Sequence, residues 1–139
     1  MKNATKNNPP PAPVAAANAA ELAAEQIEAD AAQGARTSVE RRTRAYSALL
    51  AAANGPAEDE LFDAVCDRRE AAYRLLSQDP ATTAQDLSRK LAVLVTEMLR
   101  ASSGEPQSQD LALAASALAD AVLLSATGPH LAQEAAHIA

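Results

Sequence analysis

The chain has 139 residues, with alanine the commonest, and its 12 basic and 18 acidic side chains give a net charge of −6. This length fits one small domain with tails rather than two domains. The single cysteine, Cys66, excludes an intrachain disulfide scaffold. The acidic balance argues against binding to duplex nucleic acid, because its phosphates would repel the chain.

The first 35 residues are predicted to hold an arm and a weakly anchored helix. Residues 1–13 are rich in lysine, asparagine and proline, which predicts a disordered arm. Residues 14–35 favour an Ala-rich helix by propensity, but its large apolar residues are only Val14, Leu22 and Ile27. Because such a helix has little to bury, we expect it to be conditional, forming in part or only against a partner.

A helical bundle is predicted over residues 36–127. Its first helix begins at Thr37, because Thr37 and Glu40 have the spacing of a capping box, and it ends at Gly55 and Pro56. No segment shows the alternation typical of a strand. The sequence therefore predicts an all-α fold, a small antiparallel bundle of about four helices with the extra N-terminal helix and the arm attached.

Two further helices are predicted in the middle of the chain. Three acids at residues 58–60 complement the positive end of a helix dipole and favour a first turn there, and Pro80 stops that helix. Thr83 is the next predicted N-cap, with Asp86 at the position that completes a capping box.

The C-terminal part is predicted to hold the last bundle helix and a short end segment. Ser108 leads into this helix after a Ser-Ser-Gly-Glu-Pro loop at residues 102–106. Gly128, followed by proline, is expected to end it. Residues 128–139 are then a short terminal helix or tail.

Apolar side chains recurring about once per turn mark the face that each helix is predicted to bury. Apolar residues left over at the edges are predicted to form a dimer seam, because a small Ala-rich core relies on association for stability. The seam residues are Val93, Leu99, Leu113 and Leu124. The predicted core residues are Tyr46, Leu49, Phe62, Val65, Leu76, Leu87, Leu91, Leu94, Met98, Leu118 and Val122.

The charge is spread unevenly along the chain. Residues 36–100 hold ten basic and ten acidic side chains, whereas residues 101–139 hold four acids and no lysine or arginine. The longest strongly apolar run, residues 111–124, is too short to span a bilayer, so no membrane insertion is expected. No apolar run of signal-peptide length occurs near the N-terminus, which favours a cytoplasmic protein.

Few residues of the sequence suggest a metal site or a catalytic group. His130, Glu134 and His137 share one helix face and could begin a metal site, but a di-iron motif needs further ligands, so a polar tail is favoured. Cys66 lies mid-helix with no histidine near it, which favours a packed thiol over a nucleophile. No metal, cofactor or catalytic residue is predicted, and we expect no enzyme.

Seven basic side chains of the bundle could gather into a phosphate-binding patch. Acids three and four residues away make solvated ion pairs the favoured interpretation instead. The seven are Arg41, Arg44, Arg68, Arg69, Arg74, Arg89 and Lys90.

A Pro-Ala-Thr-Thr turn at residues 80–83 joins two predicted helices, and a Ser-Ala-Leu-Ala-Asp segment follows at residues 116–120. In these two features the chain resembles a family of small, uncharacterised, all-helical bacterial proteins over about residues 38–124. The resemblance implies a small helical protein and brings no established activity.

Three function classes are compatible with this sequence. The leading hypothesis is a non-enzymatic helical interaction protein that binds a protein partner or itself. A second is an amphipathic protein on a lipid or granule surface, for which Ala/Leu helices are suited although their polar faces are not lysine-rich. A third is a regulatory protein that contacts nucleic acid through the helix arginines, which the acidic balance makes unfavourable.

Overall fold

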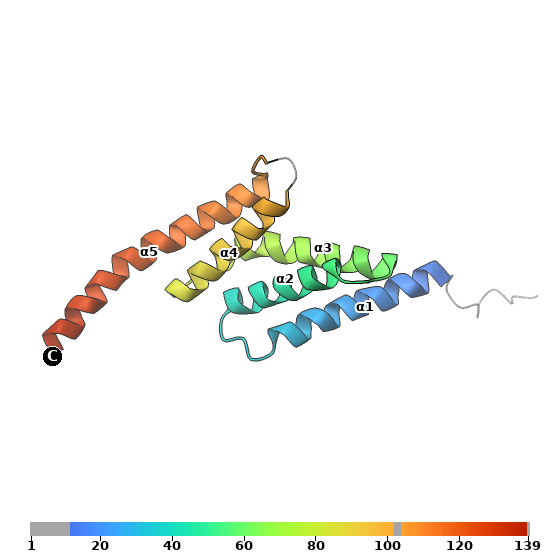
Figure 1. Ribbon diagram of the computed structural model, residues 1–139. Coiled ribbons are helices and arrows are strands. Elements are labelled where there is room, and N and C mark those ends of the chain that lie inside the picture. The colour runs from blue at the N-terminus through green and yellow to red at the C-terminus, as the bar shows by residue number, and fades with distance from the viewer. Residues whose placement is uncertain (1–11, 102–103, 139) are drawn as a thin grey trace, which may run out of the picture.

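The computed structural model describes residues 12–101 and 104–138, and the side chains of residues 17–101 and 104–127. Over these residues the chain is all-helical, without a strand, and the all-α prediction is confirmed. The predicted disordered arm lies outside the described residues, except that its last two residues already belong to the first helix. The helices are α1 (Ala12–Ala32), α2 (Ser38–Asn54), α3 (Asp59–Leu76), α4 (Ala84–Arg100) and α5 (Ser108–Ile138) (Figure 1).

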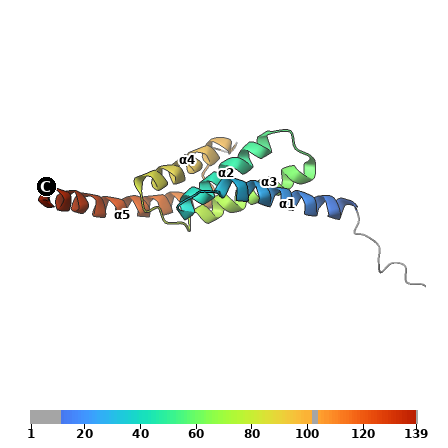
Figure 2. The same cartoon turned by 90° about the horizontal axis from the view of Figure 1, so that it is seen from below.

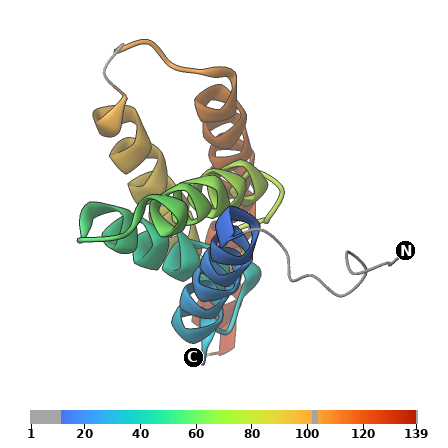
Figure 3. The same ribbon diagram turned by 90° about the vertical axis from the view of Figure 1, so that its right-hand side faces the viewer.

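Three helices form a layered unit and the last two pack on it as a hairpin. α1 contacts both α2 and α3, α2 also contacts α4, and α3 also contacts α5 (Figures 1 and 3). The C-terminal end of α5 extends past the start of α4 and lies away from the other helices in two perpendicular views (Figures 1 and 2). The end of this helix therefore lies outside the bundle.

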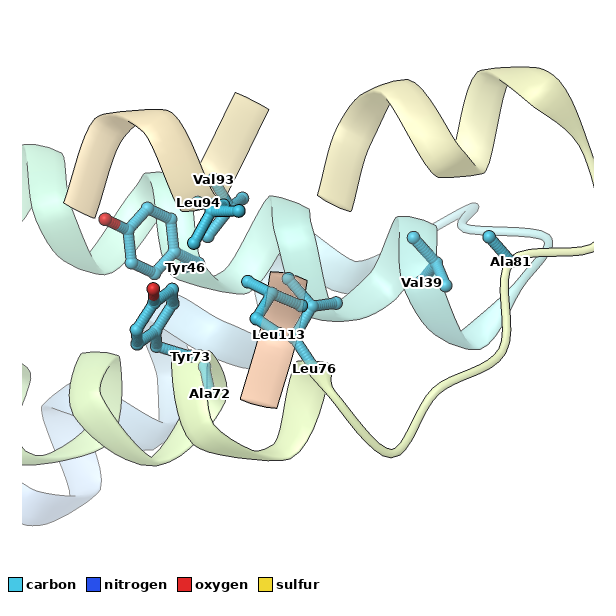
Figure 4. Packing of buried hydrophobic residues seen from close by; sticks show 9 residues of the cluster. All are labelled: Val39, Tyr46, Ala72, Tyr73, Leu76, Ala81, Val93, Leu94 and Leu113. Carbon is cyan, nitrogen blue, oxygen red and sulfur yellow. The ribbon is translucent and has the colours of Figure 1, made fainter. Parts of the chain in front are cut away.

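The apolar interior consists of two clusters. The larger one joins α2, α3, α4 and α5 around Tyr46, Tyr73, Leu76 and Leu113 (Figure 4). In the smaller one, Ala20 and Ala24 of α1 pack against apolar side chains of α2 and α3. Alanines let helix axes approach closely, which is how the Ala-rich α1 packs within the chain itself.

The predicted capping threonines lie at the starts of their helices. Thr37 Oγ1 accepts a hydrogen bond from the Glu40 N–H, and Thr83 Oγ1 accepts one from the Asp86 N–H. In neither pair does the acid return a bond to the threonine N–H; Glu40 Oε2 accepts from the Arg36 N–H. Each capping box is therefore half formed.

The other predicted turn and cap residues before Gly128 lie at or next to helix ends. α2 ends before Gly55 and Pro56, and Pro80 lies in the turn between α3 and α4. Ser108 is the first helical residue of α5 rather than its cap, because Leu111 N–H already donates to the Gln107 carbonyl.

The predicted end of the last helix at Gly128 is wrong. α5 continues through Gly128 and Pro129 to Ile138, so residues 128–138 continue this helix instead of forming a separate one. A glycine costs a helix about 1 kcal/mol relative to alanine, and a proline inside a helix costs about 3 kcal/mol or more. The helix nevertheless continues through both residues.

Part of the predicted core is on the surface. Tyr46, Leu49, Val65, Leu76 and Leu94 are buried, and Leu87 is half-buried against the larger cluster. The core assignment is wrong for five exposed side chains, which are Phe62, Leu91, Met98, Leu118 and Val122.

The predicted dimer seam is also wrong, because some residues expected on the surface are buried. Val93 and Leu113 are buried members of the larger cluster, and Leu124 is half-buried, whereas Leu99 alone of the four is exposed. In α4 and α5 the predicted inner and outer faces are thus partly exchanged, for a reason that lies in the charged side chains of the hairpin.

Among the residues that the structure describes, one helix meets the length and hydropathy requirements of a membrane span. The window Ser108–Thr127 of α5 has a mean hydropathy of 1.5, and 22% of it is buried within the protein. This window is longer than the apolar run at residues 111–124, and the expectation of no membrane insertion stays a prediction. Length and composition alone do not establish insertion.

Candidate interaction surface

A buried lysine fixes how the α4–α5 hairpin faces the bundle. Lys90 has no solvent exposure (0%), and its Nζ donates to Asp120 Oδ2 at 2.6 Å, to Ser116 Oγ at 2.7 Å and to the Asp79 carbonyl at 2.8 Å. A buried charge is tolerated only when paired and hydrogen-bonded. Ser116 and Asp120 must therefore point from α5 toward α4.

The contact between Lys90 and Ser116 resembles a nucleophile beside a base, but its geometry opposes that role. An ammonium group has three donors, and Lys90 uses all three on Asp79, Ser116 and Asp120. A nitrogen in this state has no lone pair to accept the serine proton. The cluster therefore serves to hold the hairpin in place.

A second polar network holds the other end of the hairpin. Tyr46 Oη donates to Glu97 Oε2 at 2.8 Å, and Arg69 forms an ion pair with the same carboxylate. Tyr73 Oη donates to Asp110, whose other oxygen accepts from the Gln107 N–H. Glu97 of α4 and Asp110 of α5 are thus both fastened to the interior.

Both tyrosines of the chain are held in the neutral form. Desolvation raises the pKa of Tyr46, and the hydrogen bond to Glu97 raises it further. Desolvation likewise raises the pKa of Tyr73, with the bond to Asp110 as the next cause. The centroids of the two phenol rings are 6.2 Å apart, and the rings form a tilted contact within the larger cluster.

The inward acids turn the leucines of α5 outward. Between Ser108 and Thr127 the only charged residues are Asp110 and Asp120, and both are buried. At 100° per residue, Leu118 lies about 160° around the helix from both Ser116 and Asp120, so it points away from α4.

The outward side of α5 carries a regular apolar stripe. Leu111, Leu118 and Val122 are 59%, 66% and 60% exposed, and Ala115 is exposed at the intervening position. Their spacing of four, three and four residues places all of them on one side of the helix. These four residues are called the α5 stripe below. No side chain of the described bundle covers it.

The arginines do not gather into a patch. Arg68 pairs with Glu21 at 2.7 Å, and Arg42, which was not in the predicted patch, pairs with Asp79 at 2.8 Å. Most of the remaining predicted members also have carboxylate partners: Arg44 with Glu40, Arg69 with Glu97, Arg89 with Asp86 and Lys90 with Asp120. Within the described part of the chain, only Arg41 and Arg74 of the seven form no ion pair.

The ion pairs of Glu40 connect two helices. The hydrogen bond from the Arg36 N–H lowers the pKa of Glu40, burial opposes this, and the charges of Arg44 and Arg89 lower it further. The carboxylate thereby links the start of α2 to α4, where Arg89 lies 3.8 Å away. Such arginines are occupied within the fold rather than presented to phosphates.

A cleft with a volume of about 520 Å³ lies between α1, α2 and α3. Arg42 and Arg68 line it and are both paired with carboxylates, and Glu25 and Glu28 line it as well, whereas Arg41 also lines it and forms no ion pair among the described residues. Because two of the three arginines are already neutralised, the cleft presents a single unpaired cation to a charged ligand. The cleft therefore offers less than the α5 stripe as a binding surface.

The last candidate residues are Cys66 and the three residues that could begin a metal site. Cys66 is a half-buried free thiol in the middle of α3. His130, Glu134 and His137 belong to α5, but their side chains lie outside the described residues. Among the described side chains, no group of three His, Cys, Asp or Glu could hold a metal ion.

No family model, curated protein or solved structure was found to match the chain. The resemblance drawn from the Pro-Ala-Thr-Thr turn therefore stays a prediction. In the fold this turn has a clear role, because Asp79 beside it binds Arg42 through its carboxylate and Lys90 through its carbonyl.

Proposed function

We propose that this protein is a non-enzymatic helical interaction protein that binds another protein chain through the α5 stripe. The single observation that carries the proposal is that α5 directs Asp110 and Asp120 inward and Leu111, Leu118 and Val122 outward. Exposing a regular leucine stripe while burying charges is costly in water, unless another surface covers the stripe. A partner surface removes that cost.

The polar interior supports a binding role over catalysis. Four charged groups that the hairpin directs inward, Lys90, Glu97, Asp110 and Asp120, are each hydrogen-bonded to other groups of the fold. Bonds of this kind fix the direction of helices, which supports a structural role for these four groups. We propose no cofactor and no reaction for this chain.

Affinity capture from the native host tests the proposal with matched variants. Leu118→Glu places a charge in the α5 stripe, and Leu99→Glu places the same charge on an exposed position of α4. We expect the wild-type chain and Leu99→Glu to retain the same bound proteins, including untagged copies of the chain, and Leu118→Glu to lose them. Retention of all bound proteins by a folded Leu118→Glu variant would contradict the proposal.

A lipid surface is the second candidate partner, because Ser108–Thr127 is apolar enough to enter a bilayer. The absence of lysine and arginine from residues 101–139 weakens it, since anionic headgroups attract basic side chains. Flotation with phosphatidylcholine vesicles, and with vesicles containing phosphatidylserine, distinguishes this candidate. Binding to either vesicle that Leu118→Glu abolishes would favour lipid over protein.

A further inference from the structure

We propose that α1 is a strap over the bundle, held by the charge of Arg68, which opens as a unit when salt screens that charge. The inference goes beyond the proposed function and does not rest on it. Three properties of α1 lead to it, namely its apolar contacts, its packing and its ion pairs.

The apolar contacts of α1 are few and are separate from the main core. Among its described side chains only Ala20 and Ala24 are buried, and Ile27 packs half-buried in the same smaller cluster. The larger cluster joins α2, α3, α4 and α5 and contains no described residue of α1. Opening of α1 therefore uncovers Leu49 and Val65 of the smaller cluster and leaves the larger cluster intact, which is the condition for local opening of one element.

The packing of α1 is loose toward its C-terminal end. The cleft of about 520 Å³ separates α1, α2 and α3 there, and Glu25, Glu28, Ala29 and Ala32 line it from the α1 side. Side chains that face a gap lose the dispersion attraction of close contact. This part of α1 therefore adds little to the hold of α1 on the bundle.

Arg68 of α3 supplies most of the polar hold. Its guanidinium pairs with Glu21 at 2.7 Å, with Glu28 at 3.1 Å and with Glu25 at 3.7 Å. Among the described side chains no other cation forms an ion pair with α1, and Arg44 donates a hydrogen bond to the carbonyl of the residue that follows the helix. One arginine thus gathers three carboxylates that lie on one side of α1 and repel one another.

These ion pairs are accessible to salt. The side chain of Arg68 is 27% exposed and those of its three partners are 28% to 49% exposed, whereas Lys90 in the hairpin is 0% exposed. Because ions screen exposed pairs far more than buried ones, salt weakens the hold on α1 and leaves the α4–α5 hairpin in place. Gly34 follows α1 with a φ of 77°, so the connection to α2 has a hinge residue without a strained side chain.

Hydrogen exchange of the full chain, measured by mass spectrometry, tests the strap. A free helix of this length is marginal in water, so the amides of a released α1 exchange. We expect α1 amides to exchange faster than those of α3 and α4. Raising sodium chloride from 0.01 M to 1 M shortens the Debye length from about 30 Å to about 3 Å, and should speed α1 exchange about ten-fold relative to α3 and α4.

Two variants of Arg68 and its partners have a matched control. Arg68→Gln should speed α1 exchange about ten-fold at low salt, because three exposed pairs are lost, and should remove the salt response. The control is Arg74→Gln, at an exposed arginine of the same helix without an ion pair in the described chain, and it should behave as the wild type. Glu21→Gln combined with Glu28→Gln removes two of the carboxylates and should speed α1 exchange about three-fold.

Three results would overturn the strap. One is wild-type α1 that exchanges no faster than α3, and another is α1 exchange that is the same at both salt concentrations. The third is equal α1 exchange in Arg68→Gln and Arg74→Gln. If Arg68→Gln does not fold, the double glutamine variant decides, and wild-type exchange of its α1 would overturn the strap as well.

Discussion

Breaking the ion pair between Lys90 and Asp120 should destabilise the protein far more than a surface substitution would. In Asp120→Asn the negative charge of the partner is lost, but Lys90 keeps neutral acceptors, namely the amide oxygen at position 120, Ser116 Oγ and the Asp79 carbonyl. Removal of one partner of a buried pair costs about 3–5 kcal/mol. Because neutral acceptors remain, we expect a loss of about 3 kcal/mol in the free energy of unfolding.

The control is Asp63→Asn, at an exposed position of α3 with no ion pair in the described chain. Surface substitutions of this kind change stability by less than about 0.5 kcal/mol. The assay is urea unfolding followed by circular dichroism, with all variants at one protein concentration.

The double variant Lys90→Met with Asp120→Asn separates the pair from other effects. Without the buried ammonium, loss of the carboxylate leaves no unpaired charge, so the double variant should be more stable than the sum of the two single losses predicts. If Asp120→Asn cost no more than Asp63→Asn, Asp120 would be in water, and the inward direction of the acids would be refuted.

The remaining predictions concern the interior and one cap. Leu113→Ala should cost about 2–5 kcal/mol by opening a cavity, whereas Leu22→Ala at an exposed site should cost under about 0.5 kcal/mol; equal costs in urea unfolding would contradict the assignment. Thr83→Ala should cost about 1 kcal/mol and exposed Thr82→Ala almost nothing, as thermal unfolding can measure. Tyrosinate absorbance should appear only well above pH 10, together with loss of helical signal, since both phenols have raised pKa values. That stabilisation is complete below pH 10 and is lost as the pH rises through the folded pKa values; ionisation near pH 10 in the folded protein would count against burial.

The helices and most of their ends followed from local signals. Thr37 and Thr83 start helices because a hydroxyl before a first turn satisfies a free N–H, whatever the tertiary structure. The prediction that Gly128 ends a helix is wrong, because a helix that lies away from the bundle has no packed turn to end it.

The faces of α4 and α5 could not be predicted from apolar periodicity. In α5 the positions 110, 113, 117, 120 and 124 are as regular as the stripe, and Leu113 and Leu124 belong to them. Periodicity selects the uncharged face with three large apolar residues, Leu111, Leu118 and Val122, whereas the fold buries the face that carries Asp110 and Asp120. Only the partners Tyr73 and Lys90, which are distant in sequence, decide between the two.

The sequence contained a signal for which face of α5 is buried. Asp110 and Asp120 are the only charged residues of a twenty-residue helical window, and they lie on one side of the helix. Isolated acids on one side of an apolar helix indicate buried partners as readily as they indicate solvent.

Nuclear Overhauser contacts from the tyrosine rings test most directly which face of the hairpin is inside. The two tyrosines lie in the cluster that contains Val93, Leu94 and Leu113 (Figure 4). We predict contacts from the ring protons to the methyl groups of these three residues, and none to those of Leu118 or Val122. Ring contacts to Leu118 or Val122 in place of Leu113 would contradict the account.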